Sequence, residues 1–247
     1  MVKDGNVYDS FTGPNMKHSS NTTTPSILLS SQVHRRRMAG WFSVIDDFAK
    51  EYLHNDLRDA REVMLWKLHG LSEYDIRRPL TATGTNLLGL VKHLTHTESR
   101  YLGEVFDRPY PEPLPPWDDE HVWQNSMWVT EHETREEIID RYRGAWAHSD
   151  ATINALTVDS PGHVPWWPRR NVKLFNILVH VLTETSRHAG HADILREQLD
   201  GSTGTAAGSA NSQRDAAFWE AYRAEIERAA KAAAGFTDAH GSTATMP

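Results

Sequence analysis

The chain has 247 residues and a formal net charge of -7, and it contains 14 His but no Cys. Its length is sufficient to bury a core, and 39% hydrophobic with 24% charged residues is typical of a folded globular protein. The acidic charge and the lack of a Lys/Arg-rich helix argue against nucleic acid as a partner. The absence of cysteine excludes disulfides, cysteine-ligated metals and a thiol nucleophile supplied by the protein.

The N-terminal region lacks the marks of a membrane or secretion segment. No apolar run approaches the roughly 20 residues that a bilayer requires. The arginines at residues 35–37 follow the short apolar segment 27–29, whereas a secretion signal places its charge first. We therefore expect a cytoplasmic protein with no membrane partner. Residues 1–37, rich in Ser, Thr, Asn and Gly, are predicted to be a flexible leader, and Met1 and Met38 are both candidate translation starts.

Apolar residues spaced by threes and fours predict four long helices after this leader. The predicted helices cover approximately residues 46–70, 86–106, 134–156 and 172–199. Thr85 is expected to cap the second helix, and Thr134 with Glu137 resembles a capping box at the start of the third. Gly201 is the expected stop of the fourth helix.

Proline and tryptophan mark two long connections between these helices. Residues 109–128 and 160–170 are rich in both and predict crossover loops. No alternating strand pattern is found, so residues 38–201 are predicted to form an all-α, four-helix bundle. The remaining segments are predicted to be a linker (residues 202–213), an extra C-terminal helix (214–234) and a flexible tail (235–247).

Polar side chains share one stripe of the fourth predicted helix. At about 100° per residue, this stripe spans roughly 80° of the helix. It consists of His180, Glu184, His188 and His191, and it lies among Phe175, Leu178, Leu182 and Leu195. An uncompensated polar cluster on a buried helix costs several kcal/mol, so something must satisfy it.

A divalent metal ion satisfies such a stripe well. A carboxylate and an imidazole at positions i and i+4, here Glu184 and His188, stand on successive turns, and His93 or His96 of the second predicted helix can supply a third ligand. Two imidazoles and one carboxylate leave a position open for water or substrate. Zinc is the expected ion, and Fe, Mn and Ni suit the same ligands.

Structural interpretations stand beside the metal site. A single histidine on an apolar face is commonly a satisfied core residue, and Glu184 with His188 also has the spacing of a surface ion pair. His132 and Glu133 begin like a zinc-protease motif but lack its second histidine, so we interpret them as a solvated charge cluster.

The motifs at residues 89–94 (GLVKHL) and 184–193 (ETSRHAGHAD) resemble the DinB/YfiT-like superfamily, and most closely its mycothiol-dependent metalloenzyme branch. The resemblance covers residues 38–201 and implies a DinB-like four-helix bundle. It further implies that His93, Glu184 and His188 hold the metal. His191 and Arg187 are then expected to orient substrate or move a proton. Trp166 and His96 are assigned to cofactor binding.

The resemblance implies a metal-dependent S-transferase. A low-molecular-weight thiol, mycothiol or a similar one, would be activated at the divalent metal and transferred to an electrophilic small molecule. A chain without cysteine has to take its sulfur from such a molecule. The alternatives are a non-catalytic metal-binding stress protein and a metal-dependent hydrolase or isomerase. A homodimer is the expected assembly.

Overall fold

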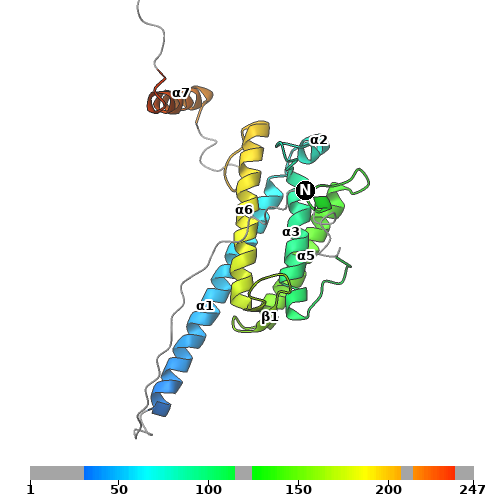
Figure 1. Ribbon diagram of the computed structural model, residues 1–247, viewed down its shortest axis with the longest axis vertical. Helices are drawn as coiled ribbons and strands as arrows, with labels where there is room; N and C mark the ends of the chain where they lie inside the picture. The colour runs from blue at the N-terminus through cyan, green and yellow to red at the C-terminus, as the bar shows by residue number, and fades with distance from the viewer. Residues whose placement is uncertain (1–30, 115–123, 207–213, 237–247) are drawn as a thin grey trace, which may run out of the picture. The chain divides into compact units, whose positions relative to one another are not determined.

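The computed structural model describes residues 31–114, 124–206 and 214–236, and its fold is all-α and DinB-like (Figure 1). The compact unit that carries the core begins at Val44, and the preceding part of α1 belongs to a separate unit. The elements are α1 (Ser31–Trp66), α2 (Glu73–Arg77), α3 (Leu87–Tyr101), the 3-10 helix η1 (Glu104–Phe106), α5 (Arg135–Ala155), β1 (Pro161–His163), β2 (Asn171–Lys173), α6 (Leu174–Asp200) and α7 (Ala216–Ala233).

Several helix ends agree with the expectations from sequence. Thr134 and Glu137 form the capping box of α5, with the Thr134 side chain accepting from the Glu137 backbone N–H. Gly201 ends α6 in the left-handed conformation, at φ 76°, which glycine adopts without a steric penalty. The predicted C-terminal helix is present as α7, and Asp215 caps its start.

Other ends differ from the expectations. α1 begins at Ser31, so residues 31–37, assigned to the flexible leader, are helical; Arg and Gln favour helix without an apolar face. Residues 1–30 lie outside the described residues. The N-cap of α3 is Asn86 rather than Thr85, since the Asn86 carboxamide accepts from the Gly89 N–H at 2.8 Å. α3 ends at Tyr101 rather than at Phe106, and residues Glu104–Phe106 form η1.

One pair of short strands, which no alternating pattern in the sequence revealed, accompanies the helices. β1 and β2 form an antiparallel hairpin in which Gly162 pairs with Val172. Val172 was expected in the fourth helix but lies in β2, where its side chain is buried. α6 begins two residues later, at Leu174. Strands of three residues are too short to show an alternating pattern, so periodicity alone does not reveal them.

Four helices, α1, α3, α5 and α6, supply most of the buried apolar side chains. The side chains form two clusters, one around Met64, Leu90, Ile138 and Leu195 and the other around Leu57, Leu102, Ile153 and Leu178. α3 packs against both α5 and α6, as Figure 1 shows. At its start α3 passes so close to a loop that a Cβ on Gly89 would lie 2.0 Å from the carbonyl oxygen of Met127. The apolar periodicity therefore identified the helices that form the core.

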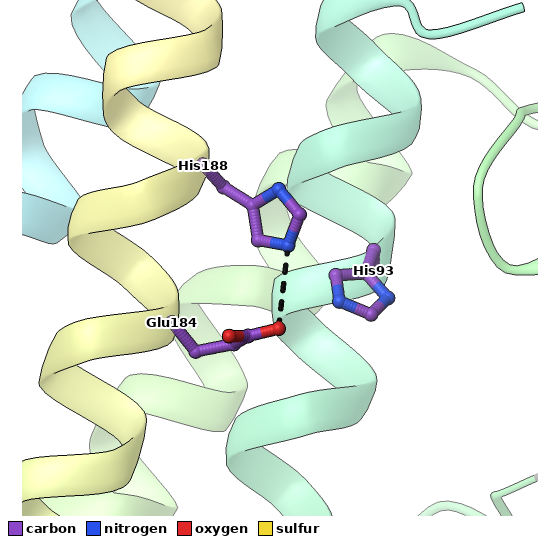
Figure 2. A group of neighbouring side chains, drawn as sticks. All are labelled: His93, Glu184 and His188. Carbon is purple, nitrogen blue, oxygen red and sulfur yellow. Dashed lines mark ion pairs between the residues drawn. The ribbon is translucent and has the colours of Figure 1, made fainter. Parts of the chain in front are cut away.

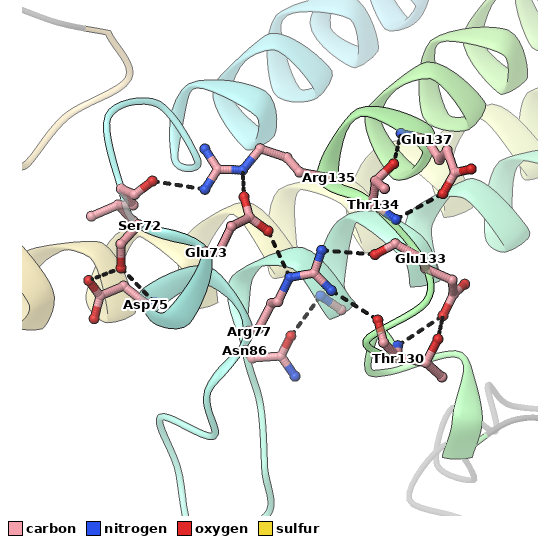
Figure 3. Close-up of polar contacts among 12 residues, drawn as sticks. Ser72, Glu73, Asp75, Arg77, Asn86, Thr130, Glu133, Thr134, Arg135 and Glu137 are labelled. Atoms are coloured by element: carbon pink, nitrogen blue, oxygen red, sulfur yellow. Dashed lines mark hydrogen bonds and ion pairs between the residues drawn. The ribbon is translucent and has the colours of Figure 1, made fainter.

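A network of hydrogen bonds and ion pairs joins α2, α3 and the start of α5 (Figure 3). The Glu133 carboxylate accepts from the Thr130 N–H at 2.9 Å and pairs with Lys92 at 2.8 Å. Arg77 donates to the backbone oxygens of Thr130 and Glu133. Glu133 is thus a structural residue held by specific partners rather than part of a solvated charge cluster, whereas the neighbouring His132 is exposed.

A buried ionic network ties α1 to α3 and α5. The Arg61 guanidinium donates to both carboxylate oxygens of Glu98, at 3.0 and 2.6 Å, and to Asp150 at 2.7 Å. The same Asp150 oxygen lies 2.7 Å from His54 Nε2. Burial opposes the charge on Arg61, but Glu98 and Asp150 outweigh it and raise the Arg61 pKa above its usual value. The pKa of Asp150 falls to about 2, because hydrogen bonds from His54 and Arg61 outweigh its own burial.

Removal of Arg61 is expected to be costly. The side chains of Arg61 and Glu98 are 1% and 0% exposed, so Arg61→Met leaves a carboxylate buried without its cation. We expect the free energy of unfolding to fall by about 3–5 kcal/mol, measured by urea denaturation. Arg58→Met is the control, because Arg58 is 49% exposed and only 3.6 Å from Asp150; it should cost less than about 1 kcal/mol. Equal losses in the two variants would contradict a special role for the buried pair.

Candidate metal centre

Three side chains from two neighbouring helices converge on one point. His93 comes from α3, and Glu184 and His188 come from successive turns of α6 (Figure 2). One ligand atom from each of the three lies within 4.8 Å of the others. The His188 Nε2 to Glu184 Oε1 distance is 3.6 Å, and the ring centroids of His93 and His188 are 4.8 Å apart.

The local sequence explains how the imidazoles reach this point. His93 is buried on the core face of α3, next to the buried Leu94. On α6, His188 is followed by Ala189 and Ala192, both buried, and small side chains permit a close approach between helices. His93 and His188 therefore face each other across the contact between α3 and α6.

The environment keeps His93 and Glu184 in forms that can bind a cation. Burial, followed by the nearby His188, lowers the pKa of His93 to about 3, so its imidazole is neutral near pH 7. The His188 imidazole, 3.6 Å away, lowers the pKa of Glu184 against the effect of burial, so the carboxylate is ionised. Neutral imidazole and ionised carboxylate are the forms that coordinate metals.

The residues present fit a divalent metal ion. Bond lengths of about 2.0–2.2 Å to His and carboxylate place tetrahedral ligand atoms roughly 3.4 Å apart. The Glu184 to His188 distance of 3.6 Å already matches this spacing, and the widest separation of 4.8 Å closes with small side-chain rotations. Two imidazoles and a carboxylate are also a ligand set that zinc enzymes use.

The other predicted site residues lie at different distances from the cluster. His191 is exposed, with its Nδ1 3.4 Å from His188 Nδ1, on the side of that ring away from Glu184. Arg187 is exposed on α6. The pKa of His191 is lowered mainly by burial, then by His188, and also by the positive charge of Arg187. Both therefore lie beside the cluster, where a small molecule could meet them.

His96 is not brought into the cluster. The pKa of His96 is lowered to about 4, mainly because the ring is buried. The positive charges of Lys92, Arg100 and, on α5, Arg141 lower it further. Its ionic surroundings thus include α5, and among the described residues the group that can hold a metal is made by His93, Glu184 and His188. Of the two histidines that the sequence offered as a third ligand, His93 and His96, the structure brings His93 next to Glu184 and His188.

An aromatic cluster lies farther along the same pair of helices. Trp166 and Trp167, in the loop of the β1–β2 hairpin, each donate an indole N–H to the Tyr101 hydroxyl oxygen, at 3.1 and 3.2 Å. The His180 ring packs against Tyr101, with centroids 4.4 Å apart, so His180 belongs here rather than with the metal ligands. Phe175, expected in the buried stripe, is 45% exposed, although its neighbours Leu174 and Leu178 are buried.

The sequence analysis did not single out Tyr101, which lies within the second predicted helix. Its position eight residues after His93, about 80° around the helix and two turns farther along, is only a weak signal. Its partners could not be read from the sequence, because they come from a hairpin loop more than 60 residues away.

Comparison with known proteins agrees with this geometry. Residues 52–201 match the family model described as mycothiol S-transferase. The chain belongs to the mycothiol S-transferase family. The match covers α3, α5 and α6 and so includes all three residues of the cluster, and it confirms the DinB/YfiT-like resemblance. No curated protein matches the chain. Among the described residues of this family member, no helix has the length and apolar character needed to cross a membrane.

The buried imidazoles predict a pH-dependent stability. The pKa of His96 is about 4 in the folded chain and about 6.5 in an unfolded one, so the unfolded state binds more protons between these values. Stability of the metal-free protein should therefore fall as the pH is lowered from about 6.5 to 4. Urea unfolding at several pH values should show a smaller slope for His96→Asn. His132→Asn is the control, since its side chain is 87% exposed; an unchanged slope in His96→Asn would contradict the prediction.

Proposed function

We propose that this protein is a metal-dependent S-transferase, which joins a low-molecular-weight thiol such as mycothiol to an electrophilic small molecule. The observation that carries the proposal is the convergence of His93, Glu184 and His188 inside the segment that matches the mycothiol S-transferase family. Family membership supports the thiol, and the cluster supports the metal. Zinc is the ion we propose, with Fe, Mn or Ni as alternatives that suit the same ligands.

Each residue of the cluster has a task in this proposal. His93 and His188 would supply imidazole nitrogens and Glu184 a negative charge, so three protein groups would hold the ion and leave a position open. A bound divalent ion lowers the pKa of a thiol at that position and keeps it as the reactive thiolate. The negative charge of Glu184 also offsets part of the ion's charge in a partly buried site.

His191 and Arg187 complete the site at its exposed side. With Nε2 of His188 directed to Glu184, its Nδ1 faces His191 at 3.4 Å, and a hydrogen bond there fixes the tautomer and orientation of the His188 ring. The Arg187 cation, on the exposed surface beside His191, can attract an anionic group of the thiol or the electrophile. These roles need no cysteine from the chain, which has none.

Metal content tests the ligand assignment. Glu184→Gln keeps the size of the side chain but removes the charge, so we expect the affinity for Zn²⁺ to fall by more than the roughly 10–100-fold seen when only a ligand's hydrogen-bond partner is lost. Elemental analysis and competition with a chelator measure this. Glu197→Gln, at an exposed position of the same helix, should bind zinc like the parent. Unchanged zinc affinity of Glu184→Gln would show that the ligand set is wrong.

Cobalt substitution tests the role of the thiol. Addition of mycothiol to the Co²⁺-loaded protein should produce a sulfur-to-cobalt charge-transfer band, because the thiolate enters the open position. His93→Ala, treated in the same way, should give no such band. A parent protein that holds cobalt but shows no band would favour water in that position, and hence hydrolysis. If the metal raises the melting temperature but no electrophile is consumed, the stress-protein alternative is favoured.

A further inference from the structure

The contact between α3 and α6 has two ends. At one end His93 faces His188, with ring centroids 4.8 Å apart, and at the other Tyr101 faces His180, with centroids 4.4 Å apart. Tyr101 follows His93 by eight residues, which is about 12 Å along a helix. Glu184 stands between the two ends, one turn after His180. Tyr101 therefore lies on the same helix contact as the proposed metal ligands, about two turns of α3 from His93.

The hydroxyl of Tyr101 is arranged as a hydrogen-bond donor. Its oxygen accepts the indole N–H groups of Trp166 and Trp167, at 3.1 and 3.2 Å, and a hydroxyl oxygen has two lone pairs. Both lone pairs of the Tyr101 oxygen then accept hydrogen bonds, so the hydroxyl group can only make a further hydrogen bond by donating its own proton. Within the described part of the chain, no acceptor takes that proton.

The surroundings keep this proton on the oxygen and connect it to the metal centre. Burial raises the pKa of Tyr101, and the charge of Glu184 acts in the same direction despite the two indole donors. The phenol is therefore protonated near pH 7. His180, whose ring packs against the Tyr101 ring, lies one turn before Glu184 on α6.

The rings around this hydroxyl are flat and partly exposed. Trp167 packs edge-on against His180, with centroids 4.8 Å apart, and Tyr101 lies 5.6 Å from Trp166. Both indoles and the Tyr101 ring are only partly buried. Aromatic faces of this kind bind flat apolar groups, while the hydroxyl fixes a polar atom.

We propose that Tyr101 is a catalytic residue that donates its proton to the carbonyl oxygen of a flat, conjugated electrophile held against Trp166 and Trp167. This inference rests on the proposed thiol transfer and adds the class of its second substrate, an α,β-unsaturated carbonyl compound. The indole N–H groups position the phenol, and they stabilise the oxygen while its proton is away.

The step is balanced without an oxidant or reductant. The thiolate sulfur forms a bond to the β-carbon, and the carbon–carbon π bond breaks. Its electron pair moves through the conjugated system to the carbonyl oxygen, which takes the Tyr101 proton. The proton that the thiol released on ionising returns to Tyr101 through solvent, and the enol becomes the ketone product.

Two electrophiles that share a phenyl ring test this role. Benzalacetone carries a conjugated carbonyl group, and benzyl chloride carries none. With zinc-loaded protein and mycothiol, Tyr101→Phe should lower kcat for benzalacetone by about 100-fold, as expected for loss of a general acid. The rate with benzyl chloride should change by less than about threefold. Tyr52→Phe makes the same chemical change at a side chain that is 58% exposed on α1, and it should alter neither rate.

A binding measurement supports the kinetics without depending on turnover. Benzylacetone is the saturated, unreactive analogue, and calorimetry should show that Tyr101→Phe binds it roughly 2–10-fold more weakly. A ring-fluorinated tyrosine introduced at position 101 keeps the shape of the side chain and is a stronger donor. It should bind benzylacetone more tightly than the parent, which tests the hydrogen bond even if Tyr101→Phe folds poorly.

The outcomes separate this inference from the proposed function. If the parent transfers mycothiol to benzyl chloride but not to benzalacetone, or if Tyr101→Phe slows both reactions equally, Tyr101 only supports the hairpin and the inference is overturned. An unchanged rate with benzalacetone in Tyr101→Phe overturns it as well. If the parent transfers mycothiol to neither electrophile, the proposed function fails and this inference fails with it.

Discussion

The burial of polar groups along α3 is the constraint on which the rest of the structure depends. This helix directs His93 toward α6 and Glu98 toward α1, and both side chains are almost fully buried. Each would cost several kcal/mol if left without compensation. Arg61 compensates Glu98 from within the fold, through two hydrogen bonds. The proposed metal ion would do the same for the cluster around His93, which links occupation of the site to the stability of the fold.

The two compensations differ in what they allow. The pair of Arg61 and Glu98 is closed, because the guanidinium and the carboxylate satisfy each other inside the core. The cluster of His93, Glu184 and His188 is open on one side, where the exposed His191 lies next to His188. A closed pair fixes the position of α3 against α1, whereas the proposed ligand set would leave room for a substrate. One helix thus supports a rigid scaffold and the proposed site on different faces.

The aromatic cluster extends this arrangement away from the metal ligands. The β1–β2 hairpin enters directly into α6, so the element that supplies Glu184 and His188 also carries the loop with Trp166 and Trp167. Their hydrogen bonds to Tyr101 join that loop to α3. The contact between α3 and α6 therefore bears the proposed site for a metal and a thiol at one end and a hydroxyl group surrounded by aromatic rings at the other. Such a division fits a reaction with two substrates.

The sequence by itself determined the helices, the capping box at Thr134 and the stop at Gly201, because these depend on contacts within a few residues of the chain. It also determined that Glu184 and His188 share a helical face, since helix geometry fixes positions i and i+4. Tertiary structure decided that His93 rather than His96 meets them, since the rotation of α3 against α6 depends on packing across the whole core. It likewise decided the short hairpin and the partners of Tyr101, because strands of three residues and contacts between distant segments leave no periodic trace.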